Sequence, residues 1–84
     1  MPYISQEERR RLALQEAQPD DAGSLNYMFT SIITQYLKYN GLRYQTINDI
    51  VGALEGAKLE FYRRIAVPYE DTKIKANGDV YLSE

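Results

Sequence analysis

The clearest pattern in the chain is an apolar face in SLNYMFTSIITQYLKYNG, residues 24–41. Apolar side chains recur there with spacings of three and one, which places them on one side of a helix. They are Leu25, Met28, Phe29, Ile32, Ile33, Tyr36 and Leu37. Ser24 is the predicted N-cap, and Asn40 with Gly41 supplies the left-handed residue that commonly ends a helix.

A second apolar face follows a short bridge, LRYQ at residues 42–45. Thr46 is the predicted N-cap of this helix, and Asp49 falls in the first turn, where the helix dipole favours an acid. The apolar side consists of Ile47, Ile50, Val51, Leu54, Ala57, Phe61 and Ile65. Because a short connection makes neighbouring helices antiparallel, we expect a helical hairpin over residues 24–67.

Two glycines, Gly52 and Gly56, lie in the middle of this second helix. Each costs about 1 kcal/mol relative to alanine in a helix interior. With Ala53 and Ala57 they form two pairs of small residues four positions apart. This pattern favours the close approach of another helix backbone, with the approach of a ligand as the alternative.

The two ends of the chain carry weaker signals. SQEE at residues 5–8 has capping-box spacing: Ser5 can accept from the Glu8 amide, and the Glu8 carboxylate can reach back to the cap. We therefore expect a helix over about residues 6–17, followed by a loop, QPDDAGS, at residues 18–24.

Pro68 is expected to end or kink the second long helix, since it lacks an amide donor. The segment that follows, residues 68–84, has two interpretations. In one, Pro68 begins a short helix that closes at Asn77–Gly78. In the other, Asn77 and Gly78 form the turn of a hairpin. We favour the helix, because an isolated two-stranded hairpin is only marginally stable.

The expected fold is therefore all-α: a short N-terminal helix, a central antiparallel helix pair and a kinked C-terminal extension. We expect one domain over residues 1–84, divided into 1–23, 24–67 and 68–84. Eighty-four residues lie near the low end of what one core can stabilise, and the chain has no Cys to crosslink it. Small chains of this kind commonly gain buried area by self-association, so we expect a homo-oligomer.

Composition argues against several classes of protein. Without His or Cys the chain lacks the usual zinc ligands, the usual general base and thiol nucleophiles. A net charge of −2 disfavours binding to duplex nucleic acid. No apolar run approaches the roughly 20 residues of a membrane span, and MPYISQEERRRL carries charges where a signal peptide is apolar. We expect a cytoplasmic protein without a cofactor.

The sequence also places no pair of carboxylates together for general acid–base catalysis. Glu55 and Glu60 are five residues apart on a helix and point to different sides, and Glu70 and Asp71 are simple neighbours. GALEGAK lacks the spacing and the Ser or Thr of a phosphate-binding loop. We therefore do not expect an enzyme.

Tyr and Arg cluster near the ends of the two long helices. The candidate ligand-binding residues are Arg43, Tyr44, Tyr62, Arg63, Arg64 and Tyr69. Tyr rings stack on bases and Arg binds phosphate in a two-pronged manner, which suits a small anionic nucleotide. Since the clusters fall at opposite ends of the hairpin, a joint site needs a second chain. The alternative is ordinary structure: Arg is favoured at helix C-termini without a ligand, and Tyr36 belongs to the core.

Four strings carry a resemblance: MPYI, LNY, GLRYQTINDIVGALEGAKLEFYRRIAVPYED and KIKANGDVY. They resemble a family of small uncharacterised proteins of tailed phages and prophages, over nearly the whole chain. The resemblance implies an accessory protein that acts in the host cytoplasm. In type, though not in motif, the chain is also similar to phage proteins that sequester nucleotide signals.

The functional expectation is a non-enzymatic protein that sequesters a small nucleotide immune signal, a cyclic nucleotide or ADP-ribose derivative, between its subunits. The alternative is an adaptor that binds and inhibits a host protein through its apolar helix face or C-terminal tail.

Overall fold

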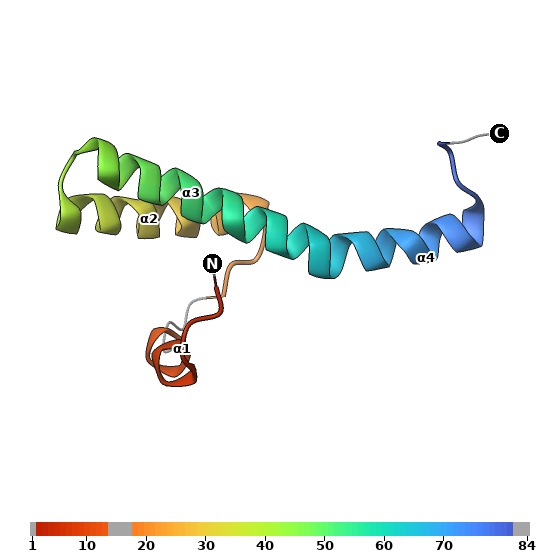
Figure 1. Ribbon diagram of the computed structural model, residues 1–84, viewed down its shortest axis with the longest axis horizontal. Coiled ribbons are helices and arrows are strands. Elements are labelled where there is room, and N and C mark those ends of the chain that lie inside the picture. The colour runs from red at the N-terminus through yellow and green to blue at the C-terminus, as the bar shows by residue number, and fades with distance from the viewer. Residues whose placement is uncertain (1, 14–17, 82–84) are drawn as a thin grey trace. The chain divides into compact units, whose positions relative to one another are not determined.

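The computed structural model describes residues 2–13 and 18–81, and these residues form helices and connections only (Figure 1). This confirms the all-α prediction. The elements in chain order are α1 (Gln6–Leu12), α2 (Ala22–Asn40), α3 (Tyr44–Phe61), the π-helical segment η1 (Tyr62–Ala66) and α4 (Val67–Asn77).

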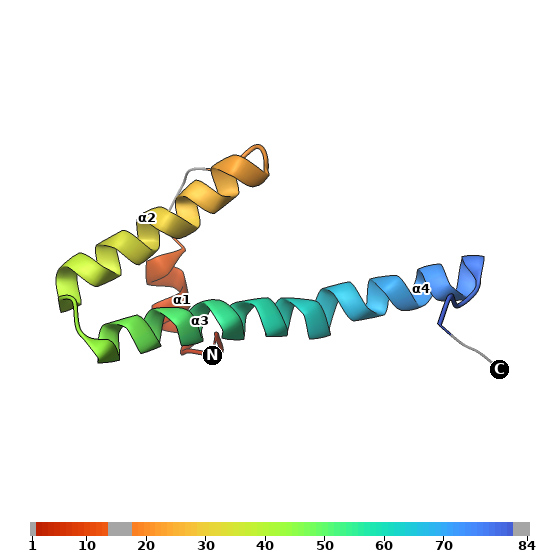
Figure 2. The same cartoon turned by 90° about the horizontal axis from the view of Figure 1, so that it is seen from above.

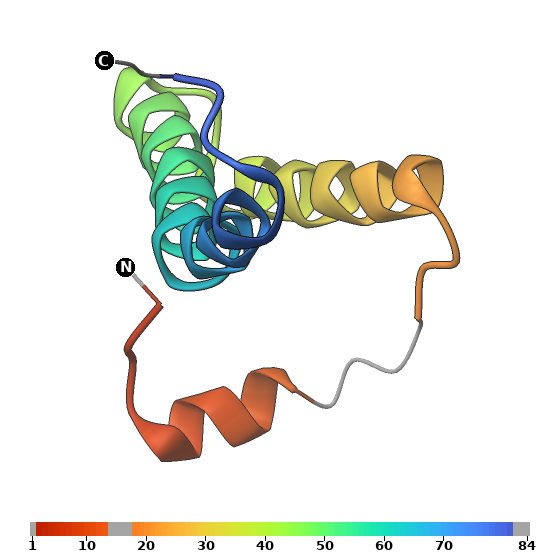
Figure 3. The same cartoon turned by 90° about the vertical axis from the view of Figure 1, so that its right-hand side faces the viewer.

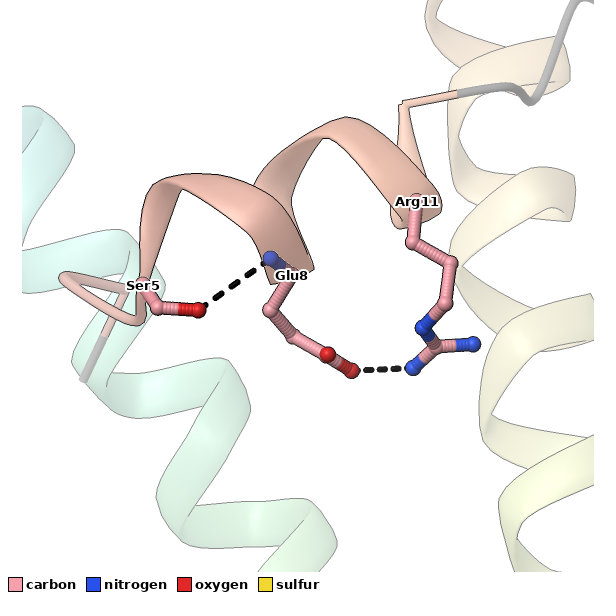
Figure 4. A network of polar contacts seen from close by, with 3 residues as sticks. All are labelled: Ser5, Glu8 and Arg11. Atoms are coloured by element: carbon pink, nitrogen blue, oxygen red, sulfur yellow. Dashed lines mark hydrogen bonds and ion pairs between the residues drawn. The ribbon is translucent and has the colours of Figure 1, made fainter.

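The first helix, α1, begins as the sequence predicts. The Ser5 hydroxyl accepts from the Glu8 amide at 3.1 Å. The second half of the capping box is wrong, because the Glu8 carboxylate accepts from the Arg11 guanidinium instead (Figure 4). This contact holds the pKa of Glu8 below its ordinary value. The helix is confirmed as far as Leu12, and the predicted residues 14–17 lie outside the described part of the chain.

The second helix, α2, begins one turn earlier than predicted. Its N-cap is Asp21, whose carboxylate accepts from the Ser24 amide at 2.8 Å, so the prediction of Ser24 as the cap is wrong. An ionised carboxylate accepts more strongly than a hydroxyl and also complements the helix dipole, which explains the preference for Asp21.

The connection between α2 and α3 is a three-residue turn, Gly41–Arg43. Gly41 has φ 85°, and its amide donates to the Leu37 carbonyl at 2.7 Å, as predicted for the end of α2. Thr46 is not a cap, because α3 already begins at Tyr44 and the Arg43 carbonyl accepts from the Ile47 amide at 3.0 Å.

The contacts of the chain divide it into two units, residues 1–53 and 54–84. In the first unit, α2 and the first residues of α3 diverge from the turn, so the expected antiparallel pair approaches closely only near the turn (Figure 2). Thr46 is the one buried side chain among the described residues. Around the turn, Ile33, Leu37 and Ile50 are half-buried.

In the second unit, the end of α3, η1 and α4 form one joined helix, seen nearly along its axis in Figure 3. Pro68 therefore does not end the helix. A proline ring in a regular α-helix collides with the carbonyl four residues back, here that of Arg64. The helical turn before Pro68 instead contains one extra residue: the Val67 amide donates to the Tyr62 carbonyl, five residues back.

The C-terminal segment is a helix, as favoured from the sequence, and the hairpin alternative is wrong for the described residues up to 81. Pro68 lies at the start of α4, which runs to Asn77. Gly78 ends it with φ 94°, and its amide donates to the Ile74 carbonyl at 2.8 Å. No helix within residues 2–13 and 18–81 is long and apolar enough to cross a membrane.

Candidate functional site

Exposed apolar side chains are the dominant surface feature. No apolar residue in the described part of the chain is buried. Large apolar side chains are exposed on every helix, among them Leu12 at 47%, Ile32 at 58% and Phe61 at 60%. Apolar surface of this kind is normally removed from water when a protein folds or assembles.

The one polar connection between α2 and α3 in the described residues centres on Asp49. One carboxylate oxygen accepts from the Tyr36 hydroxyl of α2 at 3.0 Å. The other accepts from the side-chain amide of Gln45, within α3, at 2.7 Å. Because Tyr36 donates to a carboxylate, its pKa lies above the ordinary value, and partial desolvation adds to this shift. Tyr36 is 41% exposed, so its assignment to the core is wrong. From the sequence, Asp49 is expected only to complement the helix dipole of α3, and no spacing in the sequence identifies Tyr36 as its hydrogen-bond partner.

Thr46 lies in the first turn of α3 and is 1% exposed. Its hydroxyl oxygen has no hydrogen-bond partner among the described residues. A buried polar group without a partner costs about 1–3 kcal/mol. The burial of Thr46 could not be predicted from the sequence, because a Thr before an apolar run is typical of a cap rather than of an interior residue.

Two of the six candidate ligand-binding residues lie in the first unit: Arg43 in the turn between α2 and α3, and Tyr44 at the start of α3. Tyr44 is 87% exposed. Arg43 donates through Nε to the Asn40 carbonyl at 3.3 Å, which closes the end of α2. The Tyr44 side chain is therefore accessible to a ligand or partner, whereas the Arg43 side chain is engaged in a hydrogen bond at the turn.

The other four candidates lie in the second unit. Tyr62, Arg63 and Arg64 belong to η1, and Tyr69 belongs to α4. Their tyrosine rings are 50% exposed at Tyr62 and 61% exposed at Tyr69.

Two contacts in this group are local. Arg63 donates to both carboxylate oxygens of Glu60 at 3.0 Å. The Lys73 ammonium lies 5.4 Å from the centre of the Tyr69 ring, a cation–π contact. Lys73 is not among the six candidates predicted from the sequence, although its spacing of four residues from Tyr69 indicates such a pair on a helix.

The two glycines of α3 have no close neighbour within the described chain. A methyl group built on Gly52 or Gly56 would meet nothing within 4 Å outside its own helix. The expected close approach of another helix backbone is therefore not made by the residues that the structure describes.

Two shallow depressions lie along α2, and none of the six candidates lines either of them. One lies near the end of the helix, between Ile32, Tyr36 and Tyr39. The other lies at its start, between Pro19, Gly23 and neighbouring side chains. No cluster of three or more acidic side chains that could hold a metal ion occurs within the described ranges.

Comparison with known proteins identifies a matching family. The model of a family described as a domain of unknown function (DUF6899) matches residues 1–80, a range that includes all of the helices α1 to α4. No curated protein and no solved structure matches the chain. The phage origin expected from the sequence stays a prediction.

Proposed function

The chain belongs to the DUF6899 family, and we propose that it acts by binding protein rather than by catalysis, with another copy of itself as its first partner. The observation that carries this proposal is the absence of any buried apolar side chain among the described residues. Helices that stay exposed on their apolar faces gain free energy when a partner covers those faces.

The exposed side chains are of the kind that interfaces between permanent partners cover. Obligate interfaces remove roughly 2,000–5,000 Å² of surface, summed over both partners, and are more hydrophobic than transient ones. Covering apolar surface contributes about 25 cal/mol for each Å². Association therefore supplies the stabilisation that a core would supply in a compact chain.

Thermal unfolding at several protein concentrations tests the proposal. Association stabilises only the folded, assembled chain, so Tm rises with concentration. We expect helix content, followed by circular dichroism, to fall when the protein is diluted. A cooperative transition whose Tm is the same at every concentration would overturn the proposal.

A second candidate function is the sequestration of a small anionic nucleotide between copies. It is favoured by three tyrosine rings, Tyr44, Tyr62 and Tyr69, that are at least half exposed and lie close in sequence to arginines. Exposed rings offer stacking surfaces, and Arg side chains offer donors to phosphate. The remaining alternative is an adaptor that binds a host protein through the same apolar faces.

A nucleotide panel separates these functions. Tm is measured with cyclic di- and trinucleotides and with ADP-ribose derivatives. A ligand at 100 times its Kd adds about 2.7 kcal/mol of stability. Sequestration predicts a shift that Arg64→Gln abolishes and that Arg10→Gln, a matched change on α1, leaves in place. No shift with any nucleotide would eliminate sequestration and leave protein binding.

A further inference from the structure

A continuous seam runs along one face of α3. Its members are Tyr44, Ile47, Val51, Leu54, Lys58 and Phe61. Their spacings alternate between three and four residues, which is the spacing of the contact positions in a coiled coil. All six positions lie within the single helix α3, Tyr44–Phe61.

The chain itself does not cover the α3 seam. Its apolar members are exposed by between 42% at Ile47 and 87% at Tyr44. The contacts of α3 with α2 lie on another side, where Thr46 is buried and Asp49 accepts from Tyr36. At 3.6 residues per turn, Thr46 lies about a third of a turn and Asp49 nearly half a turn from the middle of the seam.

The ends of the seam coincide with the ends of α3. Tyr44 is the first residue of the helix and Phe61 is the last. The turn Gly41–Arg43 precedes the seam, and the π-helical segment η1 interrupts the regular spacing after it. The seam therefore has a defined length and a defined middle, between Val51 and Leu54.

We propose that the α3 seam binds the same seam of a second copy, with the two α3 helices antiparallel. When two such seams run antiparallel about their middle, all six positions of each copy find a partner. Val51 then lies opposite Leu54, and the aromatic rings of Tyr44 and Phe61 pair at both ends. This proposal rests on the proposed function, since it names the surface through which the copies associate.

Lys58 decides the orientation. In a parallel, in-register pair, each seam position faces its own equivalent, so Lys58 faces Lys58 and the like charges repel. In the antiparallel pair it lies opposite Ile47, where its aliphatic stem covers apolar surface while the ammonium stays in water.

Disulfide crosslinking tests the orientation directly, because the natural chain contains no cysteine. Two single-cysteine variants, Tyr44→Cys and Phe61→Cys, are oxidised separately and as a mixture, with a mass tag on one of them. The two positions are 17 residues apart, about 26 Å along the helix. A disulfide needs Cα atoms within about 7 Å of each other, so only one arrangement can crosslink each combination.

We expect the mixture to form mainly the crossed dimer, Tyr44→Cys joined to Phe61→Cys. The matched control is Leu59→Cys, which is 57% exposed on α3 but lies outside the seam. Same-variant dimers in excess of crossed dimers would overturn the antiparallel arrangement. Crosslinking no greater than that of Leu59→Cys would overturn the seam as the interface.

A second variant strengthens the interface instead of weakening it. Lys58→Leu replaces the one charged seam position with an apolar one, and we expect the dissociation constant of the assembly to fall about tenfold. An unchanged constant would contradict the placement of Lys58 in the contact. If association persists but neither variant behaves as expected, the seam is wrong while the proposed function stands. A chain whose Tm does not depend on concentration eliminates both.

Discussion

Thr46 occupies the most protected position in the described chain, and it does so without a hydrogen bond for its hydroxyl. Its burial close to the turn means that the methyl group contributes packing while the hydroxyl adds only a desolvation cost. The Thr46 hydroxyl therefore weakens the contact between α2 and α3.

Thr46→Val should raise the free energy of unfolding by about 1 kcal/mol, because it keeps the shape and removes the unpaired hydroxyl. Thr46→Ser is the matched control: it keeps the hydroxyl, loses the methyl and should lower stability. Chemical denaturation measures both. A loss of stability in Thr46→Val would show that the hydroxyl has a partner in the assembled protein.

Asp21 makes the start of α2 sensitive to pH. The hydrogen bond from the Ser24 amide holds its pKa below the ordinary 3.8. A group whose pKa is lowered on folding stabilises the folded state above its ordinary value and loses that contribution as the pH falls through the lowered one.

We expect the Ser24 amide to lose protection from hydrogen exchange only on acidification below pH 3.8, the ordinary value for this carboxyl. Asp21→Asn caps a helix about as well but does not titrate, so its protection should stay constant over the same range. Equal pH profiles for the two proteins would contradict the role of the carboxylate.

At the scale of the elements, Pro68 explains why the long helix contains a π-turn. The segment Tyr62–Ala66 widens just before the residue that lacks an amide donor. π-Turns of this kind are frequent at functional sites, and this one contains three of the candidate ligand-binding residues. Pro68, however, accounts for this geometry without a ligand.

Pro68→Ala restores an amide and removes the ring, so η1 should convert to regular α-helix. The Val67 amide would then bond to the Arg63 carbonyl instead of that of Tyr62. An interior proline costs about 3 kcal/mol relative to alanine, and a gain in helix stability up to this size is expected. Nuclear magnetic resonance of the backbone gives the hydrogen-bond pattern, and persistence of the π-turn would contradict this account.

Gly52 tests whether anything approaches α3 on the side away from the seam. If that side is open, Gly52→Ala should add about 1 kcal/mol of helix stability. Gly41→Ala is the control and should lower stability, because φ at Gly41 is 85° and disfavours a side chain. Destabilisation by Gly52→Ala would reveal a closely packed partner at the glycines.

The sequence predicted the helices well where a local signal determines them. Gly41 and Gly78 both end helices with positive φ, as their positions indicated. The start of α2 was misplaced because Asp21 and Ser24 are each competent caps and only the folded chain selects between them. Thr46 is not the cap of α3, because that helix already begins at Tyr44. The Tyr36–Asp49 hydrogen bond joins residues 13 positions apart, and no local pattern contains it.

For the whole molecule, the account depends on the apolar surface that the chain leaves exposed. Chains of this size are marginal even when they are compact. Here no described apolar side chain is buried, so packing within the chain supplies little of the stabilisation that folding needs. A partner surface must supply the rest, and a second copy is the partner that is always present.

Sedimentation equilibrium tests this central claim most directly, because it gives the mass of the folded protein without any assumption about shape. The account predicts a mass that is a multiple of 9.7 kDa, with dissociation on dilution accompanied by loss of helix. A species of 9.7 kDa at every concentration, with its full helix content, would contradict it.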